Sequence, residues 1–270
     1  MIQFFALPFL LLITNAAAQQ TVPLVQPQTQ SFTVVVEKGE QVGTIAQRYL
    51  TEPANKHWVE VAKLNGLKSA NVIYPGMVLQ MPLRLLASQA APAKWLSVTG
   101  DVQVHQKSGA VSKAVAGAGL VEGERVVVAA NSTAILELPD GSQVQMMQGS
   151  EFVMEESRYY VGRARPNKPD SLTGTKSFSG LMRLLQGAVE ARAVSASDRA
   201  KPLRIQTPTA VVGVRGTDFR VSYGEVTRTE TLQGLVAAQL DDVRKANVPA
   251  GYGVKLDPAE KQLPVVVALL

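Results

Sequence analysis

The sequence contains no cysteine and only two histidines. Without cysteine the chain cannot form disulfides, so its 270 residues have to be stabilised by buried apolar surface. His57 and His105 form neither an HxH nor an HxxxH pattern, and we therefore expect no zinc site. Blocks of five like charges are also missing, and a net charge of +5 is too diffuse to indicate nucleic-acid binding. Such a mild positive excess suits attraction to the anionic polymers of a cell envelope.

No apolar run is long enough to span a membrane, which takes about 20 residues in a helix. The N-terminus nevertheless has an apolar run at residues 4–13, followed by Ala16-Ala17-Ala18, the small-residue pattern that signal peptidase accepts. We therefore expect a signal peptide over residues 1–18, cleaved after Ala18. This predicts a periplasmic or cell-surface location and no transmembrane span after cleavage. An uncleaved anchor is the alternative.

Two stretches of low sequence variety divide the chain. QQTVPLVQPQTQ at residues 19–30, and the stretch around ASQAAPA at residues 84–94, predict linkers. Between them, the β-branched run SFTVVV predicts a strand and VLQM before proline predicts a second one. The spacing of apolar residues predicts a helix over residues 41–50 and another that ends at Asn65-Gly66. The expected order over residues 31–83 is strand, helix, helix, strand.

This order, with the residues VVVEKGEQVGTIAQRYL, WVEVAKLNGL and VIYPGMVLQMP, resembles the LysM domain. LysM is a small βααβ module that binds glycans containing N-acetylglucosamine, such as peptidoglycan. The resemblance implies a shallow groove between the loop after the first strand and the loop before the second. The residues expected to line it are Gly39, Glu40, Gln41, Val42, Asn65, Ile73 and Tyr74. In the alternative, Val42, Ile73 and Tyr74 only pack the small core.

From Trp95 onward, short alternating runs broken by glycine predict an all-β segment over residues 95–256. Pro139-Asp140-Gly141 between two such runs predicts a tight turn. Three glycines, at 100, 187 and 234, each precede by two residues a valine that is expected to face inward, which predicts corners where only glycine fits. Residues 257–270 predict a tail or an edge strand.

The segments TGDVQVHQKSG, LLQGAVEARA, TPTAVVGVRGTDFRV and TLQGLVAA, in this order, resemble the FecR domain. FecR is an exported β-roll or β-helix-like module, best known as the periplasmic part of anti-sigma regulators. The resemblance implies a sensing or scaffolding module that contacts an envelope protein, which the sequence does not identify. The expected fold class is α+β overall, with a βααβ LysM module followed by an all-β FecR domain.

The stretch TPTAVVGVRGTDFRV interrupts a valine-rich strand with charged residues. It has neither a GxGxxG pattern nor the lysine of a phosphate-binding loop, so nucleotide binding is excluded. We expect the strand to bend at Gly213 and Gly216, and Arg215 and Asp218 to brace a structural corner. On this interpretation, Arg215→Ala lowers the melting temperature.

Catalysis and cofactors are not expected, because the chain lacks the residue constellations that common reaction types need. Glutamates could supply the paired carboxylates of a glycan hydrolase, but the alternation of the strands places them on solvent-facing positions. These glutamates are Glu137, Glu151, Glu155 and Glu190. Residues 158–168 mix aromatic and basic side chains and predict a solvated loop, with contact to anionic polymers as the alternative.

Two functions remain open. In the first, a non-enzymatic envelope protein binds peptidoglycan through LysM and presents the FecR-like domain to a protein partner. In the alternative, the protein is a FecR-type signal-sensing regulator whose LysM has weak or no affinity for glycan.

Overall fold

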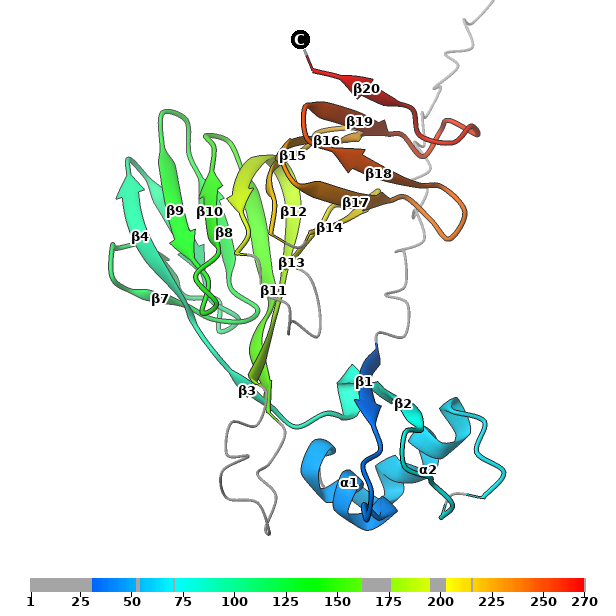
Figure 1. Ribbon diagram of the computed structural model, residues 1–270. Coiled ribbons are helices and arrows are strands. Elements are labelled where there is room, and N and C mark those ends of the chain that lie inside the picture. Colours follow the sequence, from blue (N-terminus) through cyan, green and yellow to red (C-terminus); the bar gives the residue numbers. More distant parts are fainter. Residues whose placement is uncertain are drawn as a thin grey trace, which may run out of the picture.

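The computed structural model describes residues 31–51, 54–69, 71–161, 176–194, 203–214 and 216–269. The predicted signal peptide and the first predicted linker lie outside this range. The described chain forms a small N-terminal module, residues 31–87, and a larger β-rich domain that begins at Ala93 (Figure 1). Each has its own apolar core, and the two cores are built from separate sets of buried side chains.

The N-terminal module has the predicted order of strand, helix, helix, strand. Its elements are β1 (Ser31–Val35), α1 (Val42–Tyr49), α2 (Ala54–Leu64) and β2 (Val78–Pro82). The two strands are antiparallel, with Val34 opposite Leu79. The inward faces of both helices and both strands form one apolar core, which includes Val34, Ile45, Ala46, Trp58, Val61, Leu79 and Met81.

The second predicted linker, residues 84–94, is not a tether. Most of these residues belong to a 3-10 helix (Leu83–Leu85), to β3 (Ser88–Ala90) and to the start of β4 (Ala93–Thr99). Their backbone is paired with the end of α1, because Thr51 N–H donates to Leu85 O at 2.8 Å and Ala87 N–H donates to Tyr49 O at 2.9 Å. Leu85 and Leu86 are buried. Composition indicated a linker here because the pairing of backbone groups leaves no trace in side-chain polarity.

The β-rich domain continues from β4 with strands that mostly pair with antiparallel neighbours. They are β5 (Val102–His105), β6 (Val111–Lys113), β7 (Gly119–Leu120), β8 (Arg125–Val128), β9 (Thr133–Glu137), β10 (Gln143–Met146), β11 (Glu151–Val161), β12 (Lys176–Arg192), β13 (Leu203–Gln206), β14 (Val211–Val214), β15 (Asp218–Tyr223), β16 (Thr227–Gln233), β17 (Leu235–Gln239), β18 (Lys245–Pro249), β19 (Tyr252–Leu256) and β20 (Val266–Ala268). The predicted all-β domain is confirmed. β20 pairs with β19, so residues 257–270 contribute a strand to the sheet.

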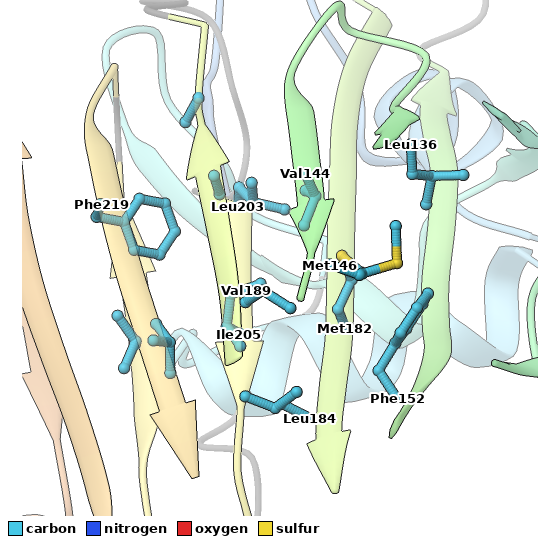
Figure 2. Packing of buried hydrophobic residues seen from close by; sticks show 14 of the residues in the cluster. Leu136, Val144, Met146, Phe152, Met182, Leu184, Val189, Leu203, Ile205 and Phe219 are labelled. Atoms are coloured by element: carbon cyan, nitrogen blue, oxygen red, sulfur yellow. The ribbon is translucent and has the colours of Figure 1, made fainter. Parts of the chain in front are cut away.

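Two sheets share the long strand β12. The first part of β12 pairs with β11 and, in parallel, with β13, whereas its last six residues, 187–192, pair with β15. One sheet therefore runs in the order β6-β5-β8-β11-β12-β13-β14-β17-β18, and the other runs β7-β4-β9-β10-β12-β15-β16-β19-β20. Alternate side chains of both sheets fill one core, which includes Leu136, Met146, Phe152, Met182 and Phe219 (Figure 2).

Glycines build three corners of the β-rich domain, as the sequence predicts. Gly100, Gly187 and Gly234 have φ angles of +81°, +88° and +86°, which disfavour any residue with a Cβ. Space is missing as well, because a Cβ would lie 2.3 Å from Ser132 Oγ, 2.5 Å from Ser150 Cα and 2.9 Å from Gly216 O, respectively. The valine two residues later is buried in each case.

A hydroxyl group closes each of these corners. Ser132 Oγ accepts from Asp101 N–H at 2.9 Å, and Ser150 Oγ accepts from Ala188 N–H at 3.0 Å. At the third corner, Thr217 Oγ1 donates to Leu235 O at 3.1 Å. The close approach of these side chains to the backbone explains why no Cβ is tolerated opposite them.

Candidate glycan-binding site

The two loops expected to form the groove lie side by side. The loop between β1 and α1 is joined to the loop between α2 and β2 by Gly76 N–H, which donates to Val36 O at 2.7 Å, and by Val36 N–H, which donates to Met77 O at 2.9 Å. Gly39 and Gly76 both have a φ angle of +84°, and a Cβ on either would have no atom within 4 Å. Glycine is therefore required there by backbone conformation, and both loop tips are open to solvent.

Tyr74 presents the largest exposed side chain of these loops, since 61% of it is accessible. A tight turn holds it in place, because Met77 N–H donates to Tyr74 O at 3.0 Å across Pro75 and Gly76. Ile73, the residue before it, packs against the core of the module. An exposed aromatic ring beside solvent-facing backbone is suited to stacking on the apolar face of a sugar.

Glu40 and Gln41 have different roles in the first loop. The Glu40 carboxylate accepts from Arg48 Nη1 at 2.6 Å and from Glu37 N–H at 2.8 Å, and 8% of its side chain is exposed. It therefore stabilises the loop and is turned away from solvent. Gln41 lies at the start of α1 with an exposed side chain, and its N–H donates to Thr44 Oγ1 at 3.3 Å. Val42 is partly buried against the core.

Asn65 connects α2 to β2. Its Nδ2 donates to Val61 O and to Gln80 O, both at 2.8 Å, and its Oδ1 accepts from Gln80 N–H at 2.7 Å. These three bonds occupy both polar atoms of the side chain. Asn65 therefore holds the end of the second helix against the closing strand.

Sequence reasoning missed three exposed valines around the loops. Val35, Val72 and Val78 are 56%, 44% and 57% exposed, and Val35 lies directly opposite Val78 in the two-stranded sheet. The alternation in SFTVVV contains the signal for the first of them, because Val34 and Val36 face the core and the residue between them has to face outward. Tyr74 thus has apolar neighbours in the chain on both sides of its turn.

The stretch TPTAVVGVRGTDFRV differs in part from its predicted form. A bend was expected at Gly213, but the structure shows none there. Gly213 lies inside β14, in register with Arg204 and Ala237. Gly216 lies between β14 and β15 with a φ angle of +61°. Arg215 lies outside the described residues, so its pairing with Asp218 stays a prediction. Asp218 itself accepts from Arg192 Nε at 3.3 Å.

The start of the same stretch forms a corner of buried hydroxyl groups, which the sequence did not reveal. Thr227 Oγ1 lies 2.5 Å from Thr207 Oγ1 and 2.7 Å from Thr209 Oγ1. Thr207 Oγ1 also accepts from Ala210 N–H at 3.0 Å. Threonine at these positions therefore satisfies the backbone of a turn that is closed to water.

Three of the four glutamates that could have supplied catalytic carboxylates are paired with arginines. The pairs are Glu151 with Arg125 at 2.8 Å, Glu155 with Arg183 at 2.5 Å and Glu190 with Arg220 at 2.7 Å. An open hollow of 180 Å³ on the outer face of the second sheet includes Glu190 and Asp218, whose arginine partners are given above. Within the described part of the chain, no group of three His, Cys, Asp or Glu side chains could hold a metal ion.

Family models identify both domains. A model of the LysM domain matches residues 34–82, and a model named FecR protein matches residues 124–237. The chain therefore contains a LysM domain followed by a FecR domain, and the predicted arrangement is confirmed. The two sheets begin before the FecR match, because β4 pairs with β9 and β5 pairs with β8.

Among solved structures, the chain is similar to two crystal structures of a candidate anti-sigma factor from Parabacteroides distasonis ATCC 8503. The identities are 16% and 14%, and each comparison covers 53% of this chain with a TM-score of 0.39. The similarity spans 59% of the length of those structures. No curated protein matches the chain. Among the helices of the described residues, none has the length and apolar character needed to cross a bilayer.

Proposed function

We propose that the protein binds peptidoglycan glycan through its LysM domain and thereby holds its FecR domain near the cell wall. The observation that carries this proposal is the exposed surface around Tyr74, where an aromatic ring, the backbone of two glycine turns and the side chain of Gln41 all reach solvent. Glycans combine apolar C–H faces with many hydroxyl and acetamide groups, which suits a shallow site of this composition.

The FecR domain serves protein contact in this proposal. Most of the glutamates that could supply catalytic carboxylates form ion pairs with arginine. This pairing favours a structural role of these side chains over a catalytic one. The protein is accordingly non-enzymatic. It is exported through the signal peptide at residues 1–18, and mass spectrometry of the mature N-terminus should find Gln19 as the first residue.

Co-sedimentation of the purified mature protein with isolated sacculi tests the glycan-binding half. We expect the protein to pellet with sacculi, and Tyr74→Ala to weaken binding by about fivefold, since stacking of one ring contributes roughly 1 kcal/mol. Tyr252→Ala is the matched control, because Tyr252 is 41% exposed on β19 in the FecR domain. No pelleting of the unsubstituted protein would reject glycan binding and leave the sensing role as the better explanation.

A zymogram tests the non-enzymatic half. The protein should leave no cleared band in a gel that contains peptidoglycan. Clearing that persists after a second purification step would show that a catalytic group exists and would overturn this part of the proposal.

A further inference from the structure

The FecR domain reaches into the LysM domain. The ends of β11 and β12 extend beyond the two-sheet body toward the N-terminal module (Figure 1). β3, which follows the LysM closing strand and its 3-10 helix, pairs with the end of β11, with Ser88 opposite Tyr160 and Ala90 opposite Arg158. The connection between the two domains is therefore a strand of the FecR sheet.

Two neighbouring tyrosines on β11 belong to different cores. Tyr159 packs against the FecR core, where its ring meets Phe178 edge-on at 5.5 Å and its hydroxyl donates to Pro139 O at 2.7 Å. Tyr160 is 8% exposed and belongs to the apolar cluster of the LysM domain, together with Leu85 and Leu86. Successive side chains of a strand point to opposite sides, so β11 contributes one ring to each core.

A buried ion pair fixes the tip of Tyr160. Its hydroxyl donates to Glu156 Oε1 at 2.8 Å, and Glu156 Oε2 accepts from Arg204 Nη2 at 3.0 Å. The Glu156 and Arg204 side chains are 15% and 7% exposed. Charges this far from water are costly unless they are paired and hydrogen-bonded, so such a pair favours one arrangement over alternatives.

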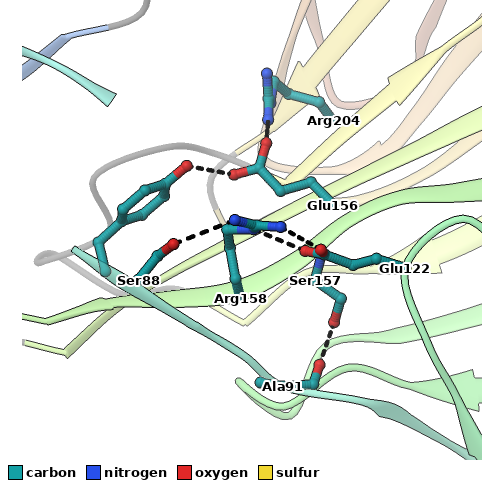
Figure 3. A network of polar contacts seen from close by, with 8 residues as sticks. Ser88, Ala91, Glu122, Glu156, Ser157, Arg158 and Arg204 are labelled. Atoms are coloured by element: carbon teal, nitrogen blue, oxygen red, sulfur yellow. Dashed lines mark hydrogen bonds and ion pairs between the residues drawn. The ribbon is translucent and has the colours of Figure 1, made fainter. Parts of the chain in front are cut away.

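A second set of bonds holds β3 against β11 (Figure 3). Arg158 donates to Glu122 through two nitrogens and to Ser88 Oγ at 3.1 Å. Ser157 N–H donates to the same Glu122 carboxylate at 2.8 Å, and Ser157 Oγ donates to Ala91 O at 2.5 Å. The segment that follows the LysM domain is thus bonded to β11 through the side chains of both Arg158 and Ser157.

We propose that Tyr160 locks the LysM and FecR domains into one rigid body, so that the LysM glycan surface has a fixed orientation relative to the FecR sheets. A wall-bound protein would then present one defined face of its FecR domain to a partner. A flexible tether would sample many orientations. The rigid junction goes beyond the proposed glycan binding and does not require it.

Distance measurement between two spin labels tests this junction in the full mature chain. The chain has no cysteine, so Lys63→Cys on α2 and Ser112→Cys on β6 give one label in each domain, both at exposed positions. We expect a single narrow distance distribution for the otherwise unsubstituted protein. A broad or multimodal distribution would overturn the proposal directly, whether or not the protein binds sacculi.

Substitutions of Tyr160 in the labelled protein assign the effect to its ring. Tyr160→Ala should broaden the distribution several-fold, whereas Tyr160→Phe should keep it narrow because the ring stays in the LysM core. Tyr160→Leu, which keeps an apolar side chain there, replaces the alanine variant if that variant does not fold, with the same broadening expected. Tyr252→Ala is the control. A folded Tyr160 variant without the ring that keeps the narrow distribution would reject the role of Tyr160.

Discussion

Asn65 and Gln80 are joined by two hydrogen bonds that run in opposite directions, from Asn65 Nδ2 to Gln80 O and from Gln80 N–H to Asn65 Oδ1. Because the side chain is used inside the domain, Asn65→Ala should lower the free energy of unfolding by roughly 1–3 kcal/mol, measured by urea denaturation. Asn71→Ala, at an exposed position of the same loop, should change it little.

The same variant distinguishes a structural from a glycan-binding role of Asn65. At a temperature where it is folded, Asn65→Ala should still co-sediment with sacculi if the native protein does. Lost binding in a folded variant would return Asn65 to the glycan surface.

Alanine substitutions of Gly187 and Gly149 distinguish two contributions to the loss of stability, the cost of a positive φ angle and the cost of a steric clash. Both have positive φ angles, +88° and +72°, but a Cβ on Gly187 would lie 2.5 Å from Ser150 Cα, whereas one on Gly149 would meet nothing within 4 Å. Gly149→Ala should therefore cost about 1–2 kcal/mol of stability, and Gly187→Ala should cost about 1–3 kcal/mol more. Equal costs in urea denaturation would contradict the steric argument.

Thr227 is fully buried and supplies the hydroxyl shared by Thr207 and Thr209. Thr227→Val keeps the shape of the side chain but removes that partner from two buried hydroxyl groups. The expected loss is about 1–3 kcal/mol in the free energy of unfolding. Thr99→Val on the exposed face of β4 is the control, and a similar loss there would show that the effect is not specific to the cluster.

Because of Tyr160, the folding stability of the protein should depend on pH in the alkaline range. Burial, followed by the nearby negative charge of Glu156, raises the pKa of Tyr160 above its ordinary value of 10.0. Above pH 10 the unfolded chain loses this proton while the folded chain keeps it, so stability is fully present below pH 10 and falls as the pH rises further. Tyr160→Phe should flatten this fall, measured as the urea midpoint between about pH 9 and 11.

The control for the pH experiment is Tyr252→Phe, at an exposed position of β19. It should keep the alkaline fall of the parent protein. An unchanged slope in Tyr160→Phe would show that the Tyr160 hydroxyl does not contribute to the pH dependence.

Local sequence patterns predicted most of the fold, because they depend on interactions between residues that are close in the sequence. The helical spacing around Ile45 and Trp58, and the glycines at 100, 187 and 234, depend on backbone conformation and on which face of an element is apolar. The residues expected at the glycan surface were less predictable. Glu40 and Asn65 are polar residues in loops, but their polar atoms are bonded inside the module to partners on neighbouring elements, Arg48 on α1 and Gln80 on β2.

The sequence by itself determined that a βααβ module is followed by an all-β domain, because apolar periodicity and turn residues specify elements and their order. Only the tertiary structure decided that residues 84–94 are bonded to both domains and that Tyr160 packs into the LysM core rather than its own. Such contacts join residues far apart in the chain, and whether a side chain meets a partner there depends on the packing of whole elements, which no local pattern encodes.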